Sequence, residues 1–234
     1  MAFVYNTFGA RPIYLSHVRK TGGTSLNFSF FALASSDPES IWTKMREDGA
    51  EIVDVGDYRF VTRNKEHIEA GRYSYAHSHI PFHELDLRDN VFTVCALRDP
   101  VDRIRSHYRM VRSNLASGVQ KRWLETEKTW MGDSVVDFCR NMPGERREAQ
   151  LRCFSKDGNI KEAVDLAMTV DHLFDFHQFT RSLNALSEKL GVKMRVFHQR
   201  KTTEDRISSS ELTELRDLLS EEILFYDAVK SHLQ

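Results

Sequence analysis

Lysine, glycine and hydroxyl side chains come together in one short segment near the N-terminus. Two adjacent glycines allow a tight turn whose backbone N–H groups point inward, and a helix that begins there adds a partial positive charge. The lysine adds a full charge, so the segment suits the binding of a phosphate or sulfate. The same residues also suit a plain turn beside a solvated lysine. They are Lys20, Thr21, Gly22, Gly23, Thr24 and Ser25.

An arginine and a serine follow a second apolar run. The run Val91–Leu97 ends at Arg98, and Ser106 lies eight positions further on, off the apolar stripe of the predicted helix. A guanidinium that is always charged and a nearby hydroxyl suit a second phosphate. Two other interpretations stay open, in which Arg98 is the structural partner of a carboxylate such as Asp102 and Ser106 is a surface serine.

Three histidines lie between these two segments, at His77, His79 and His83. His77 and His79 point to the same side of an extended strand. A neutral imidazole can take a proton from a hydroxyl near pH 7, so a general base is one interpretation. A zinc site with His83 as third ligand is another, although the spacing matches no established zinc motif. A buried histidine bonded to the backbone is the third.

Strands that alternate with helices must position these residues. Periodicities of three and four predict a helix over Val101–Leu115, with Asp99 as N-cap and Pro100 as first residue, and a helix from Leu212 to Leu233 preceded by a capping box of Ser208 and Glu211. This alternation predicts an α/β fold with a mostly parallel sheet flanked by helices, whose ligands bind beyond the carboxyl ends of the strands. The predicted strands are Pro12–Val18, Tyr73–Ala76, Val91–Leu97 and Met194–Phe197.

Composition limits the class of protein. The 234 residues are 41% hydrophobic and 29% charged, and 33 Lys and Arg against 34 Asp and Glu give a net charge of −1. This predicts a single domain over residues 1–234 and excludes the broad basic surface of a general nucleic-acid binder. Three cysteines without C-x-x-C spacing favour a reducing compartment. With no signal peptide and no long apolar window, we expect a cytoplasmic protein without an integral membrane segment.

The two anion-binding segments resemble motifs of the sulfotransferases. The first, IYLSHVRKTGGTSL, resembles their 5'-phosphosulfate loop, and the second, VFTVCALRDPVDRIRSHY, resembles their 3'-phosphate motif. The likeness is to the carbohydrate type, which includes the heparan sulfate 2-O- and 6-O-sulfotransferases and bacterial relatives. It extends weakly to Gln150 and Arg152. The resemblance implies a P-loop-like sulfotransferase fold and the donor 3'-phosphoadenosine 5'-phosphosulfate (PAPS).

By position, the resemblance implies that residues 20–25 hold the 5'-phosphosulfate of PAPS and that Arg98 and Ser106 hold its 3'-phosphate. Two departures stand out. Arg19 replaces a proline common before the lysine, and Glu148 stands where an asparagine is often found, which counts against Gln150 and Arg152 as site residues.

The resemblance also implies a reaction. His79 would act as general base, His77 as helper or substrate contact, and Lys20 would stabilise charge on the leaving phosphate oxygen. The sulfuryl group would move in line to an acceptor hydroxyl, or less readily an amine, and leave 3',5'-adenosine diphosphate, with no metal required. We expect the acceptor to be a carbohydrate, a glycolipid or a hydroxylated small metabolite. If His79 is not the base, His77, His83 and Glu84 are the next candidates.

Two other functions compete with this one. The first is a small-molecule kinase with an atypical phosphate loop. Its difficulty is that Lys20 precedes the glycines, whereas the usual nucleotide-triphosphate loop places its lysine after them. The second is a non-catalytic nucleotide-binding module, which the presence of both Lys20 and His79 does not favour.

Overall fold

The computed structural model describes residues 5–197 and 207–232. The chain forms two compact units. The sheet unit comprises the described residues of Met1–Leu97 and Leu166–Gln199, and the helical unit those of Arg98–Asp165 and Arg200–Gln234. Each is described by itself, and a single domain over residues 1–234 stays a prediction.

A six-stranded sheet forms the centre of the sheet unit, in the order β2-β3-β4-β1-β5-β6. All neighbouring pairs are parallel except β2 and β3, which form an antiparallel pair at one edge. The predicted α/β class with a mostly parallel sheet flanked by helices is confirmed. The strands are β1 Ile13–Ser16, β2 Ile52–Val55, β3 Tyr58–Thr62, β4 Tyr75–Ser78, β5 Phe92–Leu97 and β6 His172–Asp175.

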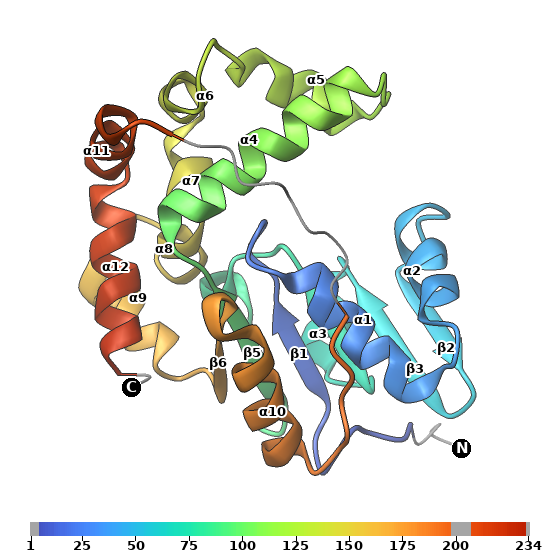
Figure 1. Ribbon diagram of the computed structural model, residues 1–234. Helices are drawn as coiled ribbons and strands as arrows, with labels where there is room; N and C mark the ends of the chain where they lie inside the picture. The colour runs from blue at the N-terminus through green and yellow to red at the C-terminus, as the bar shows by residue number, and fades with distance from the viewer. Residues whose placement is uncertain (1–4, 198–206, 233–234) are drawn as a thin grey trace. The chain divides into compact units, whose positions relative to one another are not determined.

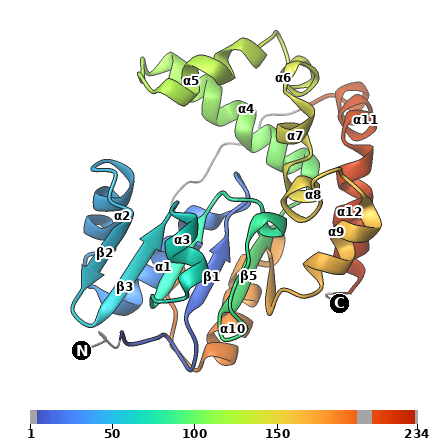
Figure 2. The same ribbon diagram turned by 180° about the vertical axis from the view of Figure 1, so that it is seen from behind.

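Alternate residues of β1 face two different layers of the core, as the period of two of a strand requires. Ile13 and Leu15 join a cluster that includes residues of α1 and α10, and Tyr14 joins another that includes Ile68 of α3. Helices α1 and α10 lie against one face of the sheet (Figure 1), and α3 lies on the other (Figure 2). The helices of this unit are α1 Gly23–Ala34, α2 Pro38–Arg46, α3 Lys65–Ala70 and α10 Phe179–Leu190, with 3-10 turns η1 Phe82–Glu84 and η3 Phe176–Gln178.

The strand predictions have a mixed outcome. The strands predicted at Pro12–Val18 and Val91–Leu97 are confirmed, and the one at Tyr73–Ala76 lies two residues later as β4. The strand predicted at Met194–Phe197 is wrong, since this segment has no regular structure. Its backbone instead accepts a hydrogen bond at Arg195 from the Ser29 hydroxyl of α1.

The described residues of the helical unit form helices without strands. Asp99 caps α4 by accepting from the N–H of Asp102, as predicted. The Ser208–Glu211 capping box is also present, but the predicted C-terminal helix is two helices that meet at Leu219, and Leu233 lies outside the described residues. The elements are α4 Pro100–Ala116, α5 Arg122–Glu127, η2 Lys128–Trp130, α6 Val135–Asn141, α7 Gly144–Arg147, α8 Ala149–Phe154, α9 Ile160–Ala167, α11 Ser209–Leu218 and α12 Ser220–Ser231.

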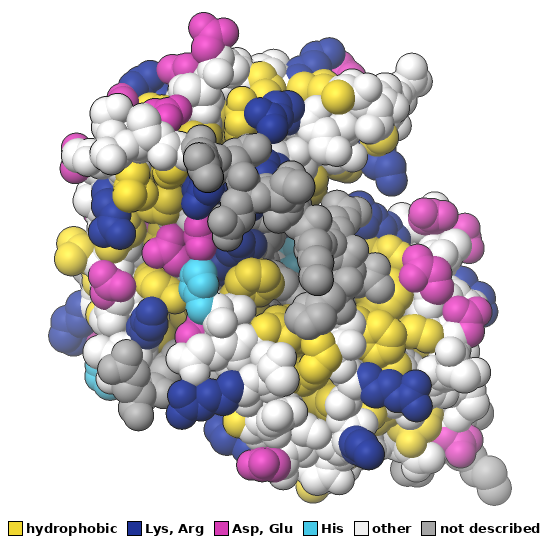
Figure 3. Space-filling view, viewed as in Figure 1, with side chains coloured by type: hydrophobic (Ala, Val, Ile, Leu, Met, Phe, Trp, Pro, Cys, Tyr) yellow, Lys and Arg dark blue, Asp and Glu magenta, His cyan; other side chains and the backbone are white. Residues whose placement is uncertain are grey.

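Two surface properties bear on the function classes. On the face drawn in Figure 3, basic and acidic side chains are scattered among uncharged ones instead of gathering in one basic area. In the part of the chain that the structure describes, every helix is too short or too polar to cross a lipid bilayer.

Candidate functional site

The predicted site residues follow the carboxyl ends of three neighbouring strands. β1 leads through His17 into residues 20–25, β4 is followed by His79, and β5 by Arg98. Ser16 at the end of β1 pairs with Ser78 at the end of β4, so these two strand ends are level. Ligands of open parallel sheets bind beyond this edge. The predicted placement at strand ends is confirmed for residues 20–25 and for Arg98. His79, which was expected in an extended strand with His77, instead follows β4, and His77 lies inside that strand. The roles of all these residues remain predictions.

Residues 20–25, which we call the glycine loop, turn the chain from β1 into α1. Gly22 is the N-cap of α1 with a φ of 91°, a conformation that glycine adopts without strain, and no side chain of the described residues caps the helix there. The first N–H groups of the helix thus have the arrangement that suits an anion. Lys20 has a φ of 72°, which is uncommon for a residue with a side chain and stores backbone strain.

Two rings occupy the space where side chains on the glycines would lie. A Cβ atom on Gly22 would come within 2.5 Å of the Phe176 ring, and one on Gly23 within 2.0 Å of the His17 ring. Both distances are far shorter than van der Waals contact. The two glycines therefore have a packing role that is independent of any ligand, and this packing fixes the shape of the loop.

The hydroxyl groups of the loop differ in what they can contact. Thr21 is fully buried and its hydroxyl donates to the carbonyl of Val18 at 2.8 Å. The one hydrogen of the Thr21 hydroxyl is therefore already used within the chain and is not available to an anion. Thr24 and Ser25, in the first turn of α1, are half-buried and keep the predicted role for their hydroxyls.

His17 belongs to this site although the sequence patterns did not single it out. Its ring centroid lies 4.5 Å from that of His79, and its side chain is 9% exposed. Burial, followed by the nearby charges of His79 and His77, lowers the pKa of His17 well below its ordinary value. The signal that could have identified it is its position directly after the first strand.

The orientation of His79 is set by a hydrogen bond to the backbone. The exposed ring of His79 uses Nδ1 to bond the carbonyl oxygen of His17. A carbonyl oxygen can only accept, so Nδ1 must carry the hydrogen. In the neutral ring Nε2 is then the basic nitrogen. This is the tautomer that a general base acting through Nε2 requires.

His77 lies deeper than His79. It is 8% exposed, and its Nε2 lies 3.4 Å from the Thr62 hydroxyl. Burial, with smaller contributions from His79 and Arg63, lowers the pKa of His77 to about 3. His77 is therefore neutral at physiological pH, and its burial favours a supporting role over direct contact with an acceptor.

The zinc interpretation of the histidines finds no support in this geometry. Within residues 5–197 and 207–232, no group of three or more His, Cys, Asp or Glu side chains is arranged to hold a metal ion. The other two candidate bases lie on η1, where His83 is half-buried and Glu84 is exposed.

The backbone of Arg98 is held at both of its polar groups. Its N–H donates to Oε1 of Gln150 at 2.8 Å, and its carbonyl accepts from Nε2 of Gln150 at 2.9 Å. Burial lowers the pKa of the Arg98 guanidinium, and the nearby Asp102 carboxylate opposes this effect. The attraction to Asp102 agrees with the structural interpretation of Arg98 and leaves the anion-binding interpretation open.

Ser106 is 7% exposed, so the alternative of a surface serine is wrong. Helix α4 is buried over more of its circumference than the apolar stripe predicts, because Arg103 and His107 are also buried. A buried hydroxyl is a stronger candidate for a specific contact than a solvated one.

Arg152 has structural partners. Its guanidinium pairs with Glu148 at 3.1 Å, donates to the carbonyl of Lys156, and lies where a Cβ atom on Gly158 would meet it at 2.9 Å. Glu148, the residue that departs from the sulfotransferase pattern, is therefore the ion-pair partner of Arg152.

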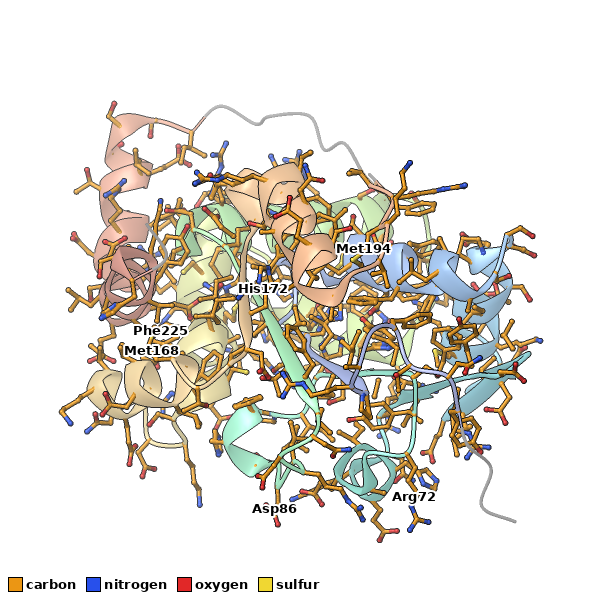
Figure 4. All side chains as sticks on the ribbon, turned by 90° about the horizontal axis from the view of Figure 1, so that it is seen from below. Arg72, Asp86, Met168, His172, Met194 and Phe225 are labelled. Carbon is orange, nitrogen blue, oxygen red and sulfur yellow. The ribbon has the colours of Figure 1, made fainter. Side chains whose placement is uncertain are left out.

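A cavity of about 420 Å³ lies elsewhere in the sheet unit. It is lined by residues near the starts of β1 and β5, among them Arg11 and Thr93, and by Asp86, which Figure 4 labels. Asp171 also lines the cavity and accepts hydrogen bonds from Arg11 and Thr93. The cavity adjoins the amino ends of these strands and does not include the predicted site residues.

Comparisons with known proteins found a weak likeness among solved structures. No protein-family model matches the chain, and no curated protein matches it. Among solved structures, a crystal structure of a sulfotransferase from Alicyclobacillus acidocaldarius aligns over 94% of this chain and 96% of its own. The two are 14% identical, with a TM-score of 0.42. The proposals below therefore rest on the residues of this chain.

Proposed function

We propose that the protein is a sulfotransferase that moves the sulfuryl group of PAPS to an acceptor hydroxyl. The observation that carries the proposal is the pairing of His79 with the segment that leads into the glycine loop. The Nδ1–H of His79 bonds the carbonyl of His17, so Nε2 is the basic nitrogen of a ring that also contacts His17, the residue just before a loop suited to an anion. A base beside an anion site is what transfer of a charged group to a hydroxyl needs.

In this proposal the glycine loop holds the 5'-phosphosulfate. The N–H groups at the start of α1 and the Thr24 and Ser25 hydroxyls donate to its oxygens, and Lys20 neutralises charge that builds on the leaving phosphate oxygen. Arg98 and Ser106 bind the 3'-phosphate. That assignment comes from the resemblance of their segment to the 3'-phosphate motif of the sulfotransferases.

The transfer step needs one base and one displacement. The acceptor oxygen attacks sulfur while Nε2 of His79 takes the hydroxyl proton. The bond between sulfur and the 5'-phosphate oxygen breaks, and 3',5'-adenosine diphosphate leaves. His17 and His77, whose pKa values are both lowered, stay neutral beside His79 and do not compete for the proton. The acceptor is proposed to be a carbohydrate, a glycolipid or a hydroxylated small metabolite.

The first test is donor binding, because a specific ligand raises the apparent thermal stability. Thermal unfolding is compared with 3',5'-adenosine diphosphate and with ATP plus magnesium. Stabilisation by the former supports the proposal. Stabilisation by ATP alone contradicts it and favours the atypical kinase.

The second test is the substitution His79→Ala. We expect binding of 3',5'-adenosine diphosphate to be retained, while transfer of labelled sulfate from PAPS to a panel of saccharides, glycolipids and hydroxylated metabolites falls by about 10²-fold to 10⁴-fold. His67→Ala, an exposed histidine on α3, is the matched control and should leave both unchanged. Full transfer activity in His79→Ala would remove His79 as the base.

A further inference from the structure

The side-chain amide of Gln150 bonds both backbone groups of Arg98, as the backbone of a neighbouring strand would. Its amide oxygen accepts from the Arg98 N–H at 2.8 Å and its amide nitrogen donates to the Arg98 carbonyl at 2.9 Å. Arg98 directly follows β5, at the point where the strand pairing of its backbone ends. The side chain of one residue thus satisfies both backbone groups of another that is 52 positions away.

The Gln150 amide can take only one orientation. Its nitrogen also donates to Oε1 of Glu222 at 3.0 Å, and both Gln150 and Glu222 are fully buried. Turning the amide around would place its oxygen against the Arg98 carbonyl and the Glu222 carboxylate, which are both acceptors. The position of Arg98 is therefore tied to that of Glu222 on α12.

Glu222 is in turn fixed by a buried arginine. Nε of Arg103 bonds Oε1 of Glu222 at 2.9 Å, and the Arg103 side chain is 1% exposed. The other guanidinium nitrogens of Arg103 donate to the backbone carbonyls of Arg146 and Arg147. Elements α4, α7, α8 and α12 of the helical unit thus all contribute to holding Gln150.

A buried polar network of this kind adds little stability, because apolar residues of similar size often stabilise a protein equally well. What the network provides in addition is a fixed geometry of its polar groups. Here the fixed group is the Arg98 backbone, which is held on one side by Gln150 and followed on the other by Asp99, the N-cap of α4. With both ends set, the direction in which the Arg98 side chain leaves the backbone is set too.

We propose that Gln150 is a positioning residue that orients the Arg98 guanidinium for binding the 3'-phosphate of the donor. This inference rests on the proposed function, because it assumes that Arg98 binds that phosphate. Gln150 itself does not contact the nucleotide; it acts through the backbone of Arg98. The departure at Glu148, which counted against Gln150 in the sequence, concerns the separate ion pair with Arg152.

The experiment measures the affinities of 3',5'-adenosine diphosphate and of adenosine 5'-monophosphate, which lacks the 3'-phosphate, by titration calorimetry. We expect Gln150→Met to weaken binding of the diphosphate about tenfold and to leave the monophosphate unchanged. The matched control is Arg152→Met on the same helix, which removes polar contacts that do not involve Arg98 and should change neither affinity. Equal weakening of both nucleotides by Gln150→Met would overturn the inference, since that indicates a general structural effect.

A double-mutant cycle separates action through Arg98 from independent action. If Gln150 works through Arg98, adding Gln150→Met to Arg98→Met should weaken diphosphate binding no further. Additive losses would overturn the inference. Gln150→Asn, which keeps the amide but is one methylene too short to reach both backbone groups, replaces Gln150→Met if that variant does not fold. If the unmodified protein does not bind 3',5'-adenosine diphosphate at all, the proposed function fails, and this outcome is distinct from failure of the Gln150 role.

Discussion

The two candidate anion-binding segments of this protein are held in place by different means. The glycine loop takes its shape from backbone conformation and from the rings of His17 and Phe176 that pack where glycine side chains would be. Arg98 is held by hydrogen bonds from Gln150, which depend on the buried pair of Arg103 and Glu222. The shape of the glycine loop depends on two residues that have no Cβ atom. The position of Arg98 depends on particular polar atoms that bond its backbone.

This difference teaches how each segment should fail. A loop shaped by packing is disrupted by an added methyl group, because a close-packed interior has no space for it. A buried polar network is disrupted when one partner is removed, because the remaining charge keeps its desolvation cost without compensation. We therefore expect a substitution that adds atoms to destabilise the glycine loop, and one that removes a charge to destabilise the network around Arg98.

The largest expected effect is that of Arg103→Met. It leaves the fully buried Glu222 carboxylate without its ionic partner, and we expect the free energy of unfolding to fall by about 4 kcal/mol. The measurement is urea unfolding. Arg105→Met is the control on the same helix, because Arg105 pairs with Asp102 at 3.3 Å in a partly exposed site and should contribute less than about 1 kcal/mol.

A second variant tests whether the loss comes from the unpaired charge. In Arg103→Met combined with Glu222→Met, both charges are gone, and we expect most of the stability to return. If Arg103→Met costs no more than Arg105→Met, the network does not hold the Arg98 segment in the way described.

The next largest effect is expected for Gly23→Ala in the loop. Alanine is normally favoured over glycine in a helix, but here its Cβ atom would lie 2.0 Å from the buried His17 ring. We expect a loss of about 2–3 kcal/mol, measured by urea unfolding. Gly144→Ala is the matched control, since Gly144 also begins a helix and the nearest atom to its added Cβ is 4.0 Å away. It should be neutral or slightly stabilising.

A further variant identifies the ring responsible. His17→Ala removes the ring atoms that the new Cβ atom would overlap. Gly23→Ala should therefore lower the free energy of unfolding less in the His17→Ala variant than in the unmodified protein. Equal stability losses in Gly23→Ala and Gly144→Ala would show that packing against His17 does not shape the loop.

Sequence patterns predicted the parts of the fold that depend on local signals. The apolar run that becomes β5, the Asp99 cap of α4 and the Ser208 capping box are each visible within a few residues. The hairpin of β2 and β3 was missed because it lies at the sheet edge, where polar residues such as Asp54 and Arg59 interrupt the apolar pattern. Met194–Phe197 has the composition of a strand, but a strand also needs a neighbour to pair with, and composition does not reveal one.

For the site too, local signals were predicted and contacts between distant residues were not. The strand-end rule located the glycine loop and Arg98, because each follows an apolar run. His79 was instead identified from the cluster of histidines and from the family resemblance. The role of Gln150 could not be predicted, since it depends on a contact between residues 52 positions apart. His17 was missed because the predicted strand ran to Val18 and so included it, whereas β1 ends at Ser16 and leaves His17 at the strand end.

The smallest expected effect, counted per pH unit, is the loss of stability in acid that buried histidines of the sheet unit cause. Burial lowers the pKa of His77 to about 3 and that of His172, on β6 (Figure 4), to about 4, and it also lowers the pKa of His17. Between these values and 6.5 the unfolded chain binds protons that the folded chain does not. The contribution of these histidines to stability is therefore complete above about pH 6.5 and is lost as the pH falls, by about 1.4 kcal/mol per pH unit for each.

The measurement is the free energy of unfolding in urea at several pH values between 7 and 4.5. His77→Phe keeps an aromatic ring between Tyr75 and Phe31 but cannot titrate, so its curve should be flatter by about 1.4 kcal/mol per pH unit. Parallel curves for His77→Phe and the unmodified protein would mean that the pKa of His77 is not lowered in the folded protein, and the acid sensitivity would then have to come from other groups such as His17 and His172.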